Sequence, residues 1–290
     1  MGGGSWTKDA FTAYSCSVGR AVDTDGIVTT SYNCAQDMYT TRRLADVLNP
    51  KNVMRECCDT EEHPNTIPVI LALDVTGSMG GAAMEVAKKL NVVMTKLYDK
   101  VKDVEFLVMG IGDLAYDDAP IQASQFESDI RIAEQLDKIY FEGGGGGNAY
   151  ESYTAAWYFG LHHTKLDCWA RGKKGIIITM GDEPLNPYLP KTPLRAATGD
   201  SLQGDVDTAE LYKAVTEKFD VYHLMVNDRQ TALKHYKQAV TNSFGKYLDG
   251  QHLMEVTLDS LADAIVDIVS NAEETSASVG AVNSNGEIAW

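Results

Sequence analysis

The fold is decided by the stretch Ile67-Pro68-Val69-Ile70-Leu71-Ala72-Leu73-Asp74-Val75-Thr76-Gly77-Ser78-Met79-Gly80. Its first part, residues 67–73, is a continuous apolar run, which is typical of a strand buried on both faces of a parallel sheet. Pro68 lies at the start of this run, where a strand tolerates it. Apolar residues then recur at helical spacing from Ala83 to Leu97, which predicts an amphipathic helix. A buried strand that leads directly into a helix predicts a βα unit.

The alternation of strands and helices continues along the chain. Further strands are predicted at residues 104–111, 175–179, 221–226 and 252–256, and further helices at 130–141, 150–163, 209–219 and 261–269. Strands that alternate with helices favour a mostly parallel sheet with helices on both faces. The prediction is an α/β fold with a doubly wound, mostly parallel sheet.

The predicted domain spans residues 66–272 and has a segment on either side. Residues 1–65 are polar, show no sustained period and contain several turn signals, so we expect an irregular N-terminal arm. Residues 273–290 are rich in Ser, Asn, Gly and Ala and predict a flexible C-terminal tail. Four aromatic residues of the arm are candidates for docking on the domain: Trp6, Phe11, Tyr14 and Tyr39.

The composition argues against several classes of partner. The chain has 25 Lys and Arg residues against 41 Asp and Glu residues, a formal net charge of −16 at pH 7. Such an excess repels polyanions, so neither nucleic acid nor an anionic membrane surface is expected as a partner. The 5 cysteines are odd in number and two are adjacent, which favours a reducing compartment over a disulfide framework. Without a secretory signal pattern or an apolar run long enough for a bilayer, we expect a soluble, cytoplasmic protein.

The end of the first strand carries a group of hard oxygen ligands. Ligands of open α/β sheets bind beyond the carboxyl ends of the strands, and Asp74 stands at such an end. An unpaired charge at the edge of the core would be costly, so its carboxylate is expected to have a cation or strong donors. Thr76 and Ser78 follow within one tight loop. Carboxylate and hydroxyl oxygens suit Mg²⁺ or Mn²⁺ better than zinc.

Two distant segments could complete this shell. Asp182 follows the second buried strand, which places it at the same sheet edge as Asp74. Asn148 follows a run of glycines, residues 143–147, where the backbone can approach closely, and it offers an amide oxygen just before a helix. If Asp74 and Asp182 are the only carboxylates, they neutralise a divalent ion, and an open position on that ion favours an acidic ligand.

With these residues the chain resembles the von Willebrand factor A (vWA) domain, whose metal-ion-dependent adhesion site carries Asp-x-Ser/Thr-x-Ser after the first strand. Asp74, Thr76 and Ser78 fill this motif, and the order of elements resembles the family over roughly residues 66–271. The resemblance implies a six-stranded, Rossmann-like sheet and a bound Mg²⁺ or Mn²⁺ ion. It also implies a protein partner whose Asp or Glu completes the coordination. Intracellular proteins similar to this one often work beside AAA-type ATPases, so such a system is a candidate partner, whereas the oligomeric state is left open.

The chain departs from the family pattern in two places. The second motif usually offers Thr or Asp in the glycine-containing loop, where this sequence has Asn148. The third usually reads Thr-Asp-Gly, whereas Thr179-Met180-Gly181-Asp182 places the acid two positions further on. Direct coordination by Asp182 and coordination through water both stay open.

The same residues allow other interpretations. Asp74, Thr76 and Ser78 could act as helix N-caps, although capping needs only one of them. A hydrolase would use Ser78 at the strand-to-helix turn with His223 or His252 downstream, but Thr76 replaces the first glycine of that motif. A phosphotransferase similar to haloacid dehalogenases would use Asp74 as nucleophile, but Thr76 replaces the acid that this family needs. We therefore expect a non-enzymatic, metal-dependent protein interaction module.

Overall fold

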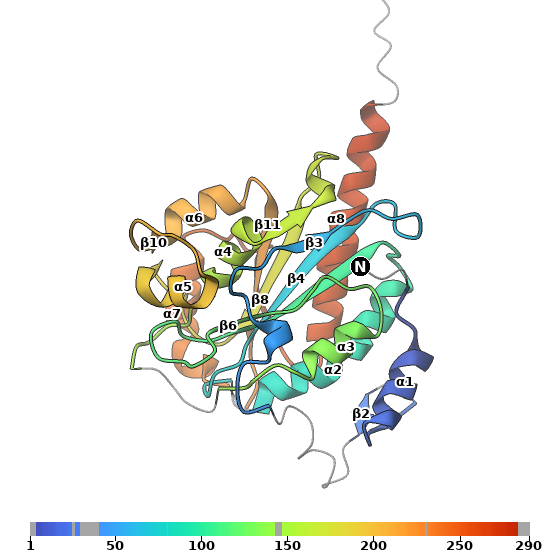
Figure 1. Cartoon of the computed structure of the whole chain (residues 1–290), viewed down its shortest axis with the longest axis horizontal. Coiled ribbons are helices and arrows are strands. Elements are labelled where there is room, and N and C mark those ends of the chain that lie inside the picture. The colour runs from blue at the N-terminus through green and yellow to red at the C-terminus, as the bar shows by residue number, and fades with distance from the viewer. Residues whose placement is uncertain are drawn as a thin grey trace, which may run out of the picture.

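A six-stranded sheet lies at the centre of the computed structural model, which describes residues 4–24, 27–29, 41–79, 81–142, 147–229 and 231–283 (Figure 1). The strand order is β12-β11-β8-β4-β5-β6. The strands are β4 (Ile67–Asp74), β5 (Val104–Ile111), β6 (Ile121–Ala123), β8 (Gly175–Gly181), β11 (Phe219–Val226) and β12 (Leu253–Val256). Neighbouring strands are parallel except β5 and β6, which are antiparallel. In chain order this is the 3-2-1-4-5-6 arrangement of doubly wound sheets, so the predicted fold class is confirmed.

Helices cover both faces of the sheet (Figure 1). One core contains residues of α2 (Gly81–Tyr98), α3 (Arg131–Leu136) and α8 (Leu261–Asn283). The other contains residues of α4 (Thr154–His162), α5 (Lys191–Thr198), α6 (Thr208–Val215) and α7 (Leu233–Phe244). Successive side chains of a strand point to opposite faces, so Val69 and Leu71 join the first core and Ile70 and Ala72 the second. This placement buries β4 on both sides. None of the helices in the described part of the chain combines the length and apolar character that crossing a membrane requires.

The N-terminal arm contains more regular structure than the sequence indicates. It forms α1 (Lys8–Ser17), the strand pair β1 (Ala21–Val22) and β2 (Val28–Thr29), the 3-10 helix η1 (Asp46–Leu48) and β3 (Arg55–Cys57). β3 pairs in parallel with β7 (Thr164–Leu166), so it belongs to the domain. The expectation of an irregular arm over residues 1–65 is wrong for these elements. Helix α1 begins after Thr7, whose Oγ1 accepts a hydrogen bond from the Ala10 amide at 3.1 Å, a cap that hydrophobic periodicity does not detect.

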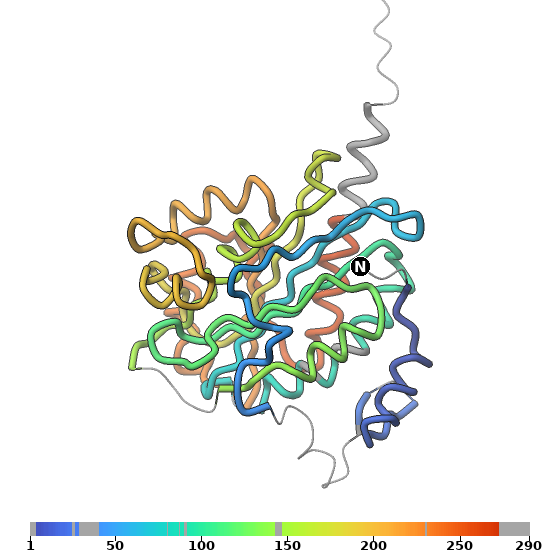
Figure 2. Tube along the Cα trace, in the orientation of Figure 1, coloured from blue at the N-terminus to red at the C-terminus, as the bar shows by residue number. Residues whose placement is uncertain are grey.

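The aromatic residues of the arm pack on the domain as the sequence suggested. Trp6 and Phe11 are 5% and 6% exposed, their rings lie 5.5 Å apart, and both belong to the core that contains α2 and α8. The Tyr14 hydroxyl donates to Asp137 Oδ2 at 2.6 Å. The trace in Figure 2 shows α1 beside α2 and α3. Tyr39 lies outside the described residues.

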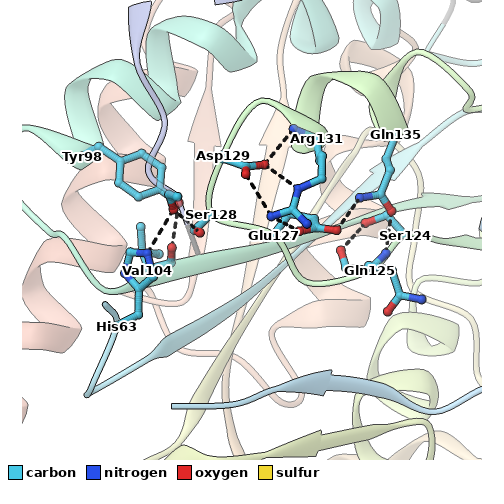
Figure 3. Close-up of polar contacts among 11 residues, drawn as sticks. His63, Tyr98, Val104, Ser124, Gln125, Glu127, Ser128, Asp129, Arg131 and Gln135 are labelled. Atoms are coloured by element: carbon cyan, nitrogen blue, oxygen red, sulfur yellow. Dashed lines mark hydrogen bonds and ion pairs between the residues drawn. The ribbon is translucent and has the colours of Figure 1, made fainter. Parts of the chain in front are cut away.

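The beginning of the arm is also held by polar contacts. The carbonyl oxygen of Gly4 accepts hydrogen bonds from Ser128 Oγ at 2.6 Å and from His63 Nε2 at 3.0 Å. Figure 3 shows His63 and Ser128 directed toward the same point, beside a cluster in which Arg131 pairs with Asp129. The arm is therefore tied to the segment between β6 and α3.

Several predicted helix boundaries are corrected. The helices expected at 150–163 and 209–219 extend over Thr154–His162 and Thr208–Val215. Helix α3 ends at Leu136 rather than at residue 141, because Gln122 hydrogen-bonds both the amide and the carbonyl of Tyr140, at 2.8 and 2.7 Å. Helix α8 continues to Asn283, into the segment assigned to a tail. Helices α5 and α7 were not predicted. The remaining short elements are the 3-10 helix η2 (Asp167–Trp169) and the strand pair β9 (Tyr188–Leu189) and β10 (Val206–Asp207).

Replacing Trp6 tests whether the arm is part of the folded domain. Because Trp6 is buried against Phe11 and its Nε1 lies 3.4 Å from Thr95 Oγ1, Trp6→Ala is expected to lower the free energy of unfolding by about 3 kcal/mol. Urea denaturation followed by circular dichroism measures this loss. Val47→Ala, at a 50% exposed position of the same arm, serves as control and should change it by less than about 0.5 kcal/mol. Equal effects of the two substitutions would contradict a docked arm.

Candidate functional site

The loop after β4 brings three oxygen-bearing side chains together. Asp74 is the last residue of β4 and is fully buried. Its Oδ1 accepts hydrogen bonds from the Thr76 amide at 2.9 Å and from Thr76 Oγ1 at 2.7 Å, the usual way in which an Asp side chain stabilises a tight turn. Thr76 Oγ1 in turn lies 3.2 Å from Ser78 Oγ. One turn therefore directs a carboxylate and two hydroxyl groups at a common region. Gly80, the last residue of this motif, lies outside the described residues.

Asp182 joins this group from the neighbouring strand. It directly follows β8, which pairs with β4 in parallel so that Leu73 is opposite Met180. Ser78 Oγ donates to Asp182 Oδ1 at 2.9 Å, and the Ala232 amide donates to Asp182 Oδ2 at 2.5 Å. Two carboxylates, Asp74 and Asp182, are thus connected through the hydroxyl groups of Thr76 and Ser78.

The glycine-containing loop supplies a residue that the sequence analysis did not select. Tyr153, at the start of α4, donates its hydroxyl hydrogen to Asp74 Oδ2 at 2.6 Å and accepts one from the Glu183 amide at 3.3 Å. A Cβ atom on Gly181 would overlap the Tyr153 hydroxyl, so glycine is needed there for the ring to reach Asp74. Tyr153 lies inside the helix predicted at residues 150–163, and its approach to Asp74 depends on Gly181 of another strand, so no local sequence pattern indicates it.

The structure does not join Asn148 to the other candidates. Its side chain contacts the phenol of Tyr150, and within the described residues no hydrogen bond links it to Asp74, Thr76, Ser78 or Asp182. Residues 143–146 of the glycine run lie outside the described residues. Coordination of a metal by Asn148 stays a prediction.

The site concentrates negative charge in a buried place. Burial, followed by the charge of Asp182, raises the pKa of Asp74 to about 7, and burial also raises the pKa of Asp182. Burial and the charge of Asp182 raise the pKa of Glu183 to about 7. Burial and the Asp74 carboxylate also raise the pKa of Tyr153 well above its usual value, so its hydroxyl keeps the proton that it donates. None of the ion pairs among the described residues involves Asp74, Asp182 or Glu183.

The donors present fit a divalent cation. Asp74, Thr76, Ser78 and Asp182 offer only carboxylate and hydroxyl oxygens, which Mg²⁺ and Mn²⁺ prefer. A cation would offset the burial, and at Asp74 also the charge of Asp182, that raise the pKa values of these acids. Within the described ranges, no three His, Cys, Asp or Glu side chains are arranged to hold a metal ion by themselves. A site here would therefore need the hydroxyl groups as well as the two carboxylates.

The histidines that a hydrolase would need are engaged elsewhere. His223 is fully buried and its Nδ1 lies 2.8 Å from Thr179 Oγ1, while His252 Nδ1 lies 2.8 Å from Asp249 Oδ1. Ser78 donates its hydrogen bond to Asp182 rather than to a histidine. No hydrogen bond among the described residues therefore joins Ser78 to a histidine that could act as its general base.

Neither a protein-family model nor a curated protein matches this chain. Similar solved structures include the open conformation of the pilus adhesin SpaC from Lactobacillus rhamnosus GG, with 16% identity and a TM-score of 0.42. That match covers 77% of this chain but only 31% of the adhesin. The vWF domain of the type V pili tip protein Mfa5 from Porphyromonas gingivalis matches with 13% identity and a TM-score of 0.44, covering 72% and 96% of the two chains. The conserved hypothetical protein BatB from Bacteroides thetaiotaomicron matches with 17% identity and a TM-score of 0.43, covering 72% and 99%. At these values the similarities establish no shared function.

The raised pKa of Asp74 predicts how the metal-free protein responds to pH. Its pKa is about 7 in the folded state against 3.8 in an ordinary environment, so between these values the folded state binds more protons than the unfolded state. The contribution of Asp74 to stability is therefore lost as pH rises from about 4 to about 7. Asp74→Asn removes this titration, so the free energy of unfolding of the variant relative to wild type should rise between pH 5 and pH 8, on the order of 2 kcal/mol.

Urea denaturation in the presence of a chelator measures this difference. Because both proteins contain the acids elsewhere whose pKa is lowered, such as Asp59 and Asp200, the contribution of these acids to the pH dependence of stability cancels in the comparison. A difference that stays constant between the two pH values would show that Asp74 has an ordinary pKa.

Proposed function

We propose that this chain is a metal-dependent protein interaction module. Asp74, Thr76, Ser78 and Asp182 would hold Mg²⁺ or Mn²⁺, and the ion would bind an Asp or Glu side chain of a partner protein. The observation that carries this proposal is the chain of oxygen atoms from Asp74 through Thr76 and Ser78 to Asp182, with successive distances of 2.7, 3.2 and 2.9 Å. The resemblance of the same loop to the vWA motif supports it independently.

The residues of the site have separable roles. Asp74 and Asp182 supply two negative charges that balance a divalent ion, and Tyr153 keeps the Asp74 carboxylate in place through its hydrogen bond. Thr76 and Ser78 add neutral oxygen ligands, so they leave the net charge of the occupied site at zero. A partner carboxylate that contacts the ion directly lies closer to its positive charge than to the carboxylates of Asp74 and Asp182, so a net attraction remains in the neutral site.

The alternative is an enzyme that uses Asp74 or Ser78 at the same turn, as a phosphotransferase or a hydrolase. The bonding of Ser78 to Asp182 and of Asp74 to Tyr153 favours the binding module, because both side chains are engaged with the other members of the site. A cytoplasmic setting and an AAA-type ATPase partner belong to the proposal as expectations from the family resemblance.

Metal binding is the first test. Calorimetric titration of metal-free protein with Mn²⁺ should show one binding event that disappears in Asp74→Ala, because that substitution removes one of the two balancing charges. Glu217→Ala, which removes an exposed acid outside the site, should bind like wild type. Circular dichroism verifies that each variant is folded. Wild-type protein that is folded and binds no Mn²⁺ would overturn the proposal.

Partner binding is the second test. Peptides selected from a random library on the Mn²⁺-loaded protein should contain Asp or Glu, and changing that residue to Asn or Gln should reduce binding at least about tenfold, because the ion–carboxylate attraction is lost. Addition of a chelator should release them, as should Asp74→Ala. Peptides that bind equally well without metal would contradict capture of an acid through the ion.

A further inference from the structure

Glu151 is placed beside the site by its backbone rather than by its side chain. Its amide donates to the Pro184 carbonyl at 3.2 Å, and it forms an isolated parallel bridge with Leu185, in the loop that follows Asp182. Its carbonyl accepts a hydrogen bond from the amide of Tyr153 at 2.9 Å. Tyr153 is the residue whose hydroxyl holds Asp74. The backbone of Glu151 is therefore held between the loop that follows Asp182 and the start of α4, which carries Tyr153.

One oxygen of the Glu151 carboxyl group is buried without a hydrogen-bond partner. The residue is 3% exposed, and its Oε2 has no hydrogen-bond partner. Buried carboxylates are normally paired or bound to a metal, since an unpaired charge is costly in the protein interior. No ion pair among the described residues includes Glu151.

The charged groups that act on Glu151 are all acidic. Asp74 has the strongest influence on it, followed by Glu183, Asp117 and Asp113. A buried acid surrounded by other acids is explained when a cation, or water held by a cation, occupies the space that they share. Asn148, the residue of the same loop that the sequence singled out, contacts Tyr150 instead.

We infer that Glu151 is the residue through which the glycine-containing loop supports the metal site. This inference rests on the proposed function. Since no three acidic side chains among the described residues converge as direct ligands, Glu151 acts on the hydration shell of the ion rather than as a ligand. It is a positioning residue that accepts a hydrogen bond from this shell and adds negative charge near it. Removing a group that hydrogen-bonds the ligands or the hydration shell of a metal commonly weakens metal binding about 10- to 100-fold.

Glu151→Gln tests this role, because glutamine keeps the shape of the side chain but cannot become a carboxylate when a cation binds. Mn²⁺ titration by calorimetry should give a dissociation constant about tenfold or more above that of wild type. Asn148→Ala should bind Mn²⁺ within about twofold of wild type. Asp113→Asn is the matched control, since Asp113 is 1% exposed, also has an unpartnered Oδ2, and has the weakest influence on Glu151 among the four acids.

Thermal unfolding separates this role from a purely structural one. In the presence of a chelator, Glu151→Gln should be about as stable as wild type, because glutamine has the shape of the buried acid and carries no charge. Saturating Mn²⁺ should raise the melting temperature of wild type more than that of Glu151→Gln at equal metal concentration. A variant that is destabilised equally with and without metal would show that Glu151 only supports the loop.

The outcomes distinguish this inference from the proposed function. If wild type binds Mn²⁺, Asp74→Ala abolishes binding and Glu151→Gln binds like wild type, the metal site stands and the role of Glu151 is overturned. If Asn148→Ala weakens binding while Glu151→Gln does not, the loop contributes through Asn148. If folded wild type binds no Mn²⁺, the proposed function fails, and the inference fails with it.

Discussion

The carboxylate of Asp74 is fully buried at the end of β4, and the loops around it are arranged so as to satisfy it. β4 lies between β5 and β8 in the sheet and is covered on both faces, which is why this carboxylate is buried. Thr76 satisfies one carboxylate oxygen and Tyr153 the other. The hydrogen bonds lower the cost of burying the charge, yet burial and Asp182 still raise the pKa to about 7. A bound cation would offset the remaining cost of burying this charge.

The doubly wound topology places the buried Asp74 carboxylate at the sheet edge where ligands of such folds bind. Because β4 and β8 are adjacent and parallel, the loops that follow them meet at the same edge of the sheet, which brings Asp182 to Ser78. α4 begins at the same edge and contributes Tyr153, which approaches Asp74 closely because Gly181 has no side chain. Three segments far apart in the chain therefore supply one group of oxygen atoms. Helix α1 packs elsewhere, on the core formed with α2 and α8.

The parts of the fold that were predictable are those where local pattern and burial agree. The apolar run of residues 67–73 and the helical period after Ala83 correspond to β4 and α2. The pattern failed where side chains of other segments decide the backbone: Gln122 ends α3 by pairing with Tyr140, and Thr7 starts α1 in a stretch without apolar period. The same limit affected the site. Tyr153 follows a glycine run that carries no periodic signal, and its approach to Asp74 depends on a glycine in another strand.

The sequence by itself determined the α/β class and the grouping of Asp74, Thr76 and Ser78, because buried strands are apolar throughout and residues two apart in a tight turn are close whatever the rest of the chain does. It also indicated Asp182, since parallel strands end at one edge of a sheet. Only the tertiary structure decided that Tyr153 contacts Asp74, that Asn148 contacts Tyr150, and that Oε2 of Glu151 is buried without a hydrogen-bond partner. These facts depend on how α4 and the loop after β8 pack together, and contacts between segments so distant in sequence leave no local pattern.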